Sequence, residues 1–212
     1  MLQKLRDPVS SLTHLAGAIL AIPCTVVLIV AASRHSTRHI VAFAIFGASL
    51  ILLYTTSAVY HMPRFSEKAI RILQRIDHMM IFVLIAGTYT PACLLPLRGP
   101  WGWTLFGLVW GFAIAGIILK AFWMDAPDWL SATIYVITGW LALIAIYPIM
   151  QTVSTKALVL VVSGGVAYTV GAVIFSTEWP KLKWRYFGPH EIFHLLVLLG
   201  SSLHVAFMFQ LI

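Results

Sequence analysis

The chain has 212 residues, of which 60% are hydrophobic and only 10% are charged, whereas a soluble domain averages about 25% charged residues. This composition and a mean hydropathy of +0.93 exclude an ordinary soluble domain and predict an integral membrane protein. The net charge of +7 does not indicate nucleic-acid binding, because the basic residues lie between apolar stretches. Cys24 and Cys93 lie inside apolar stretches and predict no disulfide framework.

Seven apolar stretches are long enough to cross a bilayer, which takes roughly 20 residues in a helix. We therefore expect one all-α domain over residues 1–212, an integral membrane bundle of seven transmembrane helices. The first stretch is interpreted as a helix and not as a secretion signal, whose apolar core spans only about 7–15 residues. The predicted spans are about 12–32, 40–61, 77–96, 102–122, 130–149, 157–177 and 190–211.

The placement of lysine and arginine predicts the orientation, because cytoplasmic segments of membrane proteins are enriched in both. With the N-terminus inside, ten of these residues fall in cytoplasmic segments and four in outer segments. We therefore expect a cytoplasmic N-terminus and an outer C-terminus. The inner residues are Lys4, Arg6, Arg64, Lys68, Arg71, Arg75, Lys120, Lys181, Lys183 and Arg185, and the outer ones are Arg34, Arg38, Arg98 and Lys156.

The segment before the third span, PRFSEKAIRILQRID, has the pattern of an amphipathic helix. Its basic residues follow one another at spacings of four, three and four, which places them on one helical face. These residues are Arg64, Lys68, Arg71 and Arg75. We expect this helix to lie in the inner interface of the membrane, with its cations toward anionic headgroups.

Ionisable side chains gather at the predicted cytoplasmic ends of three spans. His61 ends the second span, Asp77 begins the third, and His190 and His194 open the seventh. His190 and His194 are four residues apart and therefore share a helix face at a separation of about 6 Å. Ser57 stands at the same spacing before His61. Because buried ionisable groups in membranes are usually functional, this coincidence predicts a site.

Three imidazoles and a water form the open tetrahedral arrangement of a catalytic zinc site. We therefore expect Zn²⁺ as cofactor, with His61, His190 and His194 as its ligands. Asp77 would offset the charge that three neutral imidazoles leave uncompensated. The other helical histidines are interpreted as packed or hydrogen-bonded residues, and these are His14, His78 and His204.

The segments SAVYH, DHMMIFVLIAGTYTP and HEIFHLLVLLGSSLH resemble the bacterial haemolysin III family. This family belongs to the progestin and adipoQ receptor group, which includes the adiponectin receptors and is related to the alkaline ceramidases. The resemblance covers nearly the whole chain. It implies an intramembrane zinc near the cytoplasmic face, with His61, His190 and His194 as ligands. It also implies that Asp77 holds the water of the site and that Ser57 is a polar neighbour.

The resemblance further implies a cytoplasmic N-terminus, an outer C-terminus and a place in the bacterial cell membrane. The expected partners are membrane lipids, including a ceramide-like or fatty-acyl ligand, and no nucleic acid. The N-terminal segment DPVSSLTH departs from the family pattern: it offers the acidic Asp7, but Ser10 stands where an asparagine is expected.

Several functions remain open from the sequence. The first is a zinc-dependent hydrolase of a lipid amide or ester, in which Asp77 activates water and Ser57 steadies the oxyanion. The segment HEIFH also matches the H-E-x-x-H pattern of zinc proteases, with Glu191 as general base. Asp77 is favoured as the active carboxylate, since Glu191 points about 100° away from His190 around the helix.

Two further functions need no catalysis. The zinc can be structural, tying helices together in a sensor or receptor of membrane state that contributes to membrane homeostasis. A pore-forming haemolysin is the last alternative, which the scarcity of charged residues within the spans disfavours.

Overall fold

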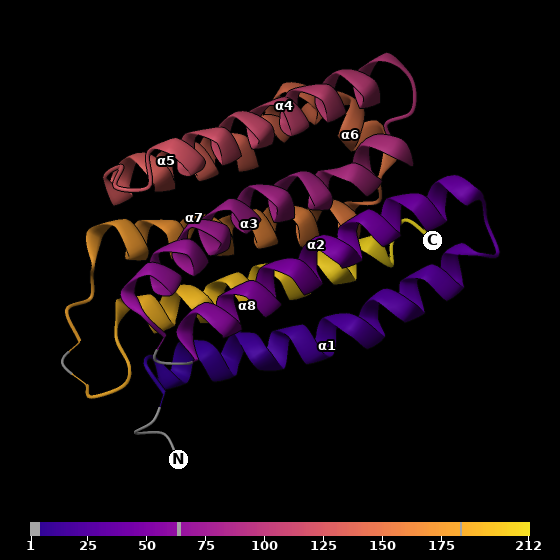
Figure 1. Ribbon diagram of the computed structural model, residues 1–212. Coiled ribbons are helices and arrows are strands. Elements are labelled where there is room, and N and C mark those ends of the chain that lie inside the picture. Colours follow the sequence, from indigo (N-terminus) through magenta and orange to yellow (C-terminus); the bar gives the residue numbers. More distant parts are fainter. Residues whose placement is uncertain (1–4, 63–64, 183) are drawn as a thin grey trace.

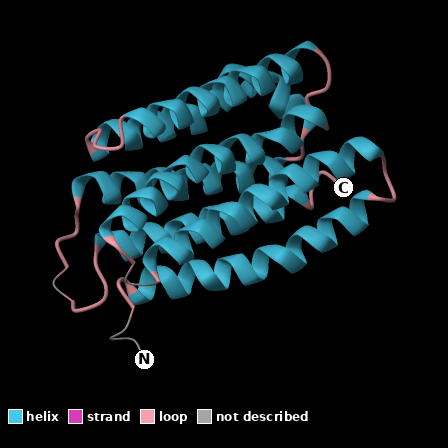
Figure 2. Ribbon diagram, in the orientation of Figure 1, coloured by secondary structure: helices cyan, strands magenta, loops and turns pink. Residues whose placement is uncertain are grey.

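The computed structural model describes residues 5–62, 65–182 and 184–212, and the regular structure in these ranges is helical (Figures 1 and 2). The prediction of an all-α architecture is confirmed. The elements are α1 (Pro8–Ala32), α2 (Thr37–His61), α3 (Glu67–Leu94), α4 (Pro100–Phe122), α5 (Asp128–Gly139), the 3-10 helix η2 (Leu141–Ala145), α6 (Ile146–Thr152), α7 (Thr155–Thr177) and α8 (Pro189–Met208).

Six helical stretches in the described ranges are long and apolar enough to cross a membrane. They are α1, α2, α4, the stretch Asp128–Thr152 that joins α5, η2 and α6, α7 and α8. Their outer faces carry large apolar side chains. Leu20, Ile114 and Val159, for example, are 63%, 53% and 58% exposed. Contiguous apolar surface of this kind is expected where a helix bundle faces lipid.

The seventh long helix, α3, does not meet both of these criteria. It packs between α2 and α4. The helix begins after Ser66, whose hydroxyl accepts a hydrogen bond from the backbone N–H of Ala69, and it runs unbroken to Leu94. The segment predicted to form a helix in the inner interface is thus the first part of α3, because nothing interrupts the helix between that segment and the predicted third span. Its place in the membrane interface stays a prediction.

The amphipathic pattern itself is real. Lys68, Arg71 and Arg75 are all exposed on the first turns of α3, whereas Arg64 lies outside the described residues.

The predicted fifth span, 130–149, is interrupted near its middle. α5 ends at Gly139, and the chain passes through η2 before α6 begins. Within a bilayer, the polar backbone groups freed by such a break need partners. The Tyr89 hydroxyl of α3 donates to the Gly139 carbonyl at 2.6 Å and accepts from the Ala142 N–H at 2.9 Å. The break is therefore built into the bundle through a side chain of another helix.

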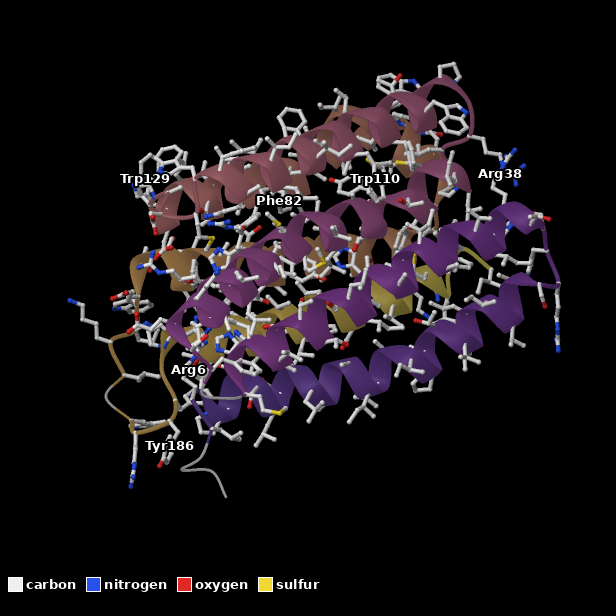
Figure 3. The ribbon with its side chains drawn as sticks, viewed as in Figure 1. Arg6, Arg38, Phe82, Trp110, Trp129 and Tyr186 are labelled. Carbon is white, nitrogen blue, oxygen red and sulfur yellow. The ribbon has the colours of Figure 1, made fainter. Side chains whose placement is uncertain are left out.

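The helices lie roughly parallel, and successive long helices run in opposite directions (Figure 1). The start of α1, the end of α2 and the starts of α3 and α8 therefore lie at one end of the bundle, and the C-terminus lies at the other. Arg6 and Arg38 mark these two ends in Figure 3. This alternation brings the residues of the candidate site together.

Candidate metal centre

The structure brings the three predicted histidine ligands together. His61 is the last residue of α2, and His190 and His194 lie on the first turns of α8. One ring nitrogen of each lies within 4.8 Å of the others. The Nε2 atoms of His194 and His190 are 3.1 Å apart, and those of His190 and His61 are 3.4 Å apart. The three imidazoles therefore converge on one point.

The start of α8 fixes where two of these rings lie. Pro189 occupies the first helical position, where a missing N–H costs nothing. The Glu191 carboxylate accepts a hydrogen bond at 2.8 Å from the backbone N–H of Gly188, the residue before the helix. His190 and His194 consequently stand one turn apart on a face that looks into the bundle, where His194 is fully buried.

Asp7 orients the ring of His61. Its Oδ2 atom lies 2.8 Å from His61 Nδ1 and 2.9 Å from Arg6 Nε. The hydrogen bond with His61 lowers the pKa of the Asp7 carboxyl to about 2, although burial acts in the opposite direction. Asp7 is therefore a carboxylate at neutral pH, and it accepts the Nδ1–H of His61. That tautomer leaves the lone pair of His61 on Nε2, which faces the other two histidines.

The sequence reasoning did not identify this role of Asp7. The signal was available, because the same topology that places His61 at the inner face also places the start of the first helix there. The structure joins the two segments through their backbones as well: the Asp7 N–H donates to the His61 carbonyl at 3.1 Å. Arg6 packs its guanidinium over the ring of Tyr60, 4.1 Å from the ring centroid.

His14 of α1 is the closest aromatic neighbour of His194. The two rings stack with their centroids 3.8 Å apart. His14 is buried, as predicted for a packed residue, but neither of its ring nitrogens has a hydrogen-bond partner among the described residues. It does not belong to the group whose nitrogens converge within 4.8 Å.

Asp77 and Ser57, the predicted catalytic residues, lie beside the histidines. Ser57 is buried, and both residues line the same cavity as His190 and His194. Asp77 does not share the convergence point of the three imidazoles. Its position is that of a neighbouring group and not of a fourth ligand.

Both carboxylate oxygens of Glu191 are engaged elsewhere. Oε2 accepts from the Gly188 N–H, and Oε1 accepts from the Ser10 hydroxyl at 2.8 Å. The Ser10 hydroxyl thus ties α1 to the start of α8. Glu191 has a helix-capping and helix-joining role in this arrangement.

A cavity of about 420 Å³ extends from the histidines through the bundle. Such a volume falls within the range of small-molecule sites. Its polar end includes His14, Ser57, Asp77, His190 and His194, and its far end includes Leu97, Leu105, Val153 and Phe207. A mainly apolar passage therefore opens from the histidine site along the helices.

Comparison with known proteins identifies the family. The family model described as Haemolysin-III related matches residues 2–205. Hemolysin-3 of Bacillus cereus is 42% identical over 195 residues, which cover 92% of this chain and 86% of that protein. The Hemolysin-3 homolog of Bacillus subtilis is 40% identical over 194 residues, covering 91% of this chain and 88% of that protein.

A more distant similarity extends to an animal protein. The human monocyte to macrophage differentiation factor is 24% identical over 164 residues, which cover 76% of this chain and 66% of that protein. The family match spans almost the entire chain, and the apolar helices described above agree with it. The resemblance inferred from the sequence is thus confirmed: the chain belongs to the haemolysin III-related family and is a multi-pass membrane protein.

Proposed function

We propose that this protein is a zinc-dependent hydrolase that cleaves an amide or ester bond of a membrane lipid of the ceramide type. The observation that carries the proposal is the meeting of three imidazole nitrogens with Asp77 and Ser57 at the polar end of a mainly apolar cavity. The bacterial relatives support a place in the bacterial cell membrane.

The residues present fit a zinc ion. Zinc–nitrogen bonds of 2.0–2.1 Å in a tetrahedron place neighbouring ligand nitrogens about 3.3 Å apart. The two Nε2 separations of 3.1 and 3.4 Å are close to this value. The carboxylate of Asp7 on His61 Nδ1 is the partner that metal-binding histidines usually have. Nitrogen lone pairs that converge in a buried site are best satisfied by a divalent cation.

The chemistry divides between the ion and the chain. A bound zinc ion polarises a carbonyl and makes water acidic enough to react at neutral pH. The Asp77 carboxylate accepts a proton from the attacking water and returns it to the leaving nitrogen or oxygen as the bond to the acyl carbon breaks. The Ser57 hydroxyl donates a hydrogen bond to the developing oxyanion. The cavity holds the apolar chain of the lipid.

The topology completes the proposal. α3 is proposed to cross the membrane as the seventh span, with the N-terminus in the cytoplasm. Two observations support this: α3 packs between two apolar helices over its length, and the basic residues Arg71 and Arg75 extend from its first turns at the end of the bundle that carries Arg6. The histidine site then lies near the cytoplasmic face.

The first test concerns the metal. Purified wild-type protein is expected to contain about one zinc per chain, and His194→Ala is expected to lose most of it, because three-histidine coordination is reduced to two ligands. His35→Ala provides the control, since His35 is exposed in the loop between α1 and α2. Equal zinc in wild type and His194→Ala would remove His194 from the site.

The second test concerns catalysis. With zinc content measured alongside, Asp77→Asn is expected to lower the hydrolysis of an N-acyl sphingoid base by about 10²–10⁴-fold. Glu191→Gln is expected to retain most activity, because Glu191 contacts Gly188 and Ser10. An inactive, zinc-loaded Glu191→Gln beside a fully active Asp77→Asn would instead support a protease-like mechanism. Zinc-loaded wild type that cleaves no lipid amide or ester would overturn the hydrolase proposal and favour a membrane-state sensor with a structural zinc.

A further inference from the structure

A second polar cluster lies beside the cavity, away from the histidine site, and two of its members, Tyr168 and His204, line the cavity. The Tyr54 hydroxyl of α2 donates to Ser201 Oγ at 2.6 Å, and the Tyr168 hydroxyl of α7 lies 2.8 Å from the same oxygen. The ring of Tyr168 stacks on that of His204, with centroids 5.3 Å apart and planes inclined by 16°. The hydroxyl groups of the two tyrosines and the serine thus hydrogen-bond to one another, and His204 joins the cluster through its stacked ring.

His204 has one ring nitrogen that this network does not use. Its Nδ1 lies 2.7 Å from the Gly200 carbonyl. Because a carbonyl only accepts, Nδ1 carries the proton and Nε2 carries the lone pair. Nε2 has no hydrogen-bond partner within the part of the chain that the structure describes. His204 is 5% exposed and lines the cavity, so a molecule bound in the cavity lies beside this residue.

Two glycines make room for the cluster. A Cβ atom at Gly164 would lie 2.5 Å from the His204 ring, and one at Gly200 would lie 2.6 Å from the Tyr168 ring. Real Cβ atoms do not approach other atoms so closely. Any larger residue at either position would therefore displace a ring. The rings of His204 and Tyr168 can occupy these positions only because residues 164 and 200 are glycines.

The depth of the cluster follows from helix geometry. His204 lies ten residues beyond His194, which corresponds to about 15 Å along α8. Thr88 lies eleven residues beyond Asp77 on α3, or about 16 Å. Both helices start at the same end of the bundle (Figure 1). The hydroxyl of Thr88 is buried, has no partner among the described residues and belongs to a residue that lines the same cavity. His204 and the unpaired Thr88 hydroxyl therefore lie at about the same depth along the bundle.

We propose that the cavity binds a lipid with a hydroxyl group partway along its apolar chain, and that His204 Nε2 accepts a hydrogen bond from this hydroxyl. The inference rests on the proposed lipid-binding function of the cavity and adds a substrate preference to it. A site built to bind a hydroxyl discriminates against an analogue that lacks one, because its own polar group is then left unpaired. The histidine site would hold the polar head of the lipid. His204 would select lipids whose chain hydroxyl lies at the matching distance from that head.

The test measures the binding of octadecanoate and of hydroxyoctadecanoate isomers to purified, zinc-loaded protein in lipid nanodiscs by calorimetry. The mid-chain isomers, with the hydroxyl on the tenth or twelfth carbon, are expected to bind about tenfold more tightly than octadecanoate. The isomer with its hydroxyl on the second carbon is expected to show no such gain. In His204→Phe the preference for mid-chain isomers should disappear, whereas it should persist in the exposed control His35→Phe.

The outcomes separate this inference from the proposed function. Equal binding of octadecanoate and all the hydroxyoctadecanoates by wild type would overturn the role of His204 and leave the proposed lipid cavity intact. No binding of any fatty acid would overturn both. A preference that survives in His204→Phe would assign the hydroxyl to another group. If His204→Phe does not fold, the comparison on wild type alone still overturns the proposal when octadecanoate and the mid-chain hydroxy acids bind equally.

Discussion

Asp7 is the residue whose substitution most directly tests how the histidine group is held. Its carboxylate fixes the tautomer of His61 and places a negative charge beside the proposed cation. Asp7→Asn should weaken zinc binding by about 10–100-fold, as is typical when the partner of a metal-binding histidine is changed. Competition with a chelator measures this affinity. Asp125→Asn, an exposed change between α4 and α5, is the matched control. Unchanged affinity in Asp7→Asn would make Asp7 a purely structural contact.

For individual residues, the sequence predicted those contacts that follow from helical spacing and from the order of the spans. His190 and His194 share a helix face because they are four residues apart, and the predicted topology added His61 and Asp77 to them. The contacts of Asp7 with His61 and of Ser10 with Glu191 join residues 54 and 181 positions apart. No periodicity links such residues, so these contacts depended on how α1 packs against α2 and α8.

Among the elements, the break between α5 and η2 depends on Tyr89. Tyr89→Phe leaves the Gly139 carbonyl and the Ala142 N–H without their side-chain partner. We expect the free energy of unfolding to fall by about 1–3 kcal/mol. Denaturation in detergent, followed by circular dichroism, measures the change. Zinc content should stay at the wild-type level, because the break lies away from the histidines along the bundle.

Tyr147→Phe is the control for this experiment. Tyr147 is 73% exposed on α6, and its hydroxyl has no hydrogen-bond partner among the described residues. The same loss of stability in both variants would show that the Tyr89 hydroxyl does not stabilise the break. The sequence predicted one uninterrupted helix over 130–149, since its run of apolar residues contains no proline before Pro148. The interruption depends on a tyrosine of α3, which local sequence cannot reveal.

The whole molecule constrains the number of membrane crossings. The start of α1 and the C-terminus lie at opposite ends of the bundle (Figure 1). An even number of crossings would return the chain to its starting side. In the proposed topology α3 therefore supplies the odd crossing beside the six strongly apolar stretches, although its first turns carry Lys68, Arg71 and Arg75. The sequence predicted seven spans because it counted only the apolar part of this helix.

This geometry leads to a prediction about the termini. A reporter fused to the N-terminus should be active only in the cytoplasm, and one fused after Ile212 only outside, because basic residues are retained on the cytoplasmic side. Among the described residues the end of the bundle with Arg6 also carries Lys181 and Arg185, whereas Arg38 marks the less basic end (Figure 3). Reporters on the same side would show that α3 does not cross. Reporters on opposite sides but exchanged would keep the seven spans and move the histidine site to the outer face, where zinc would have to be acquired from outside the cell.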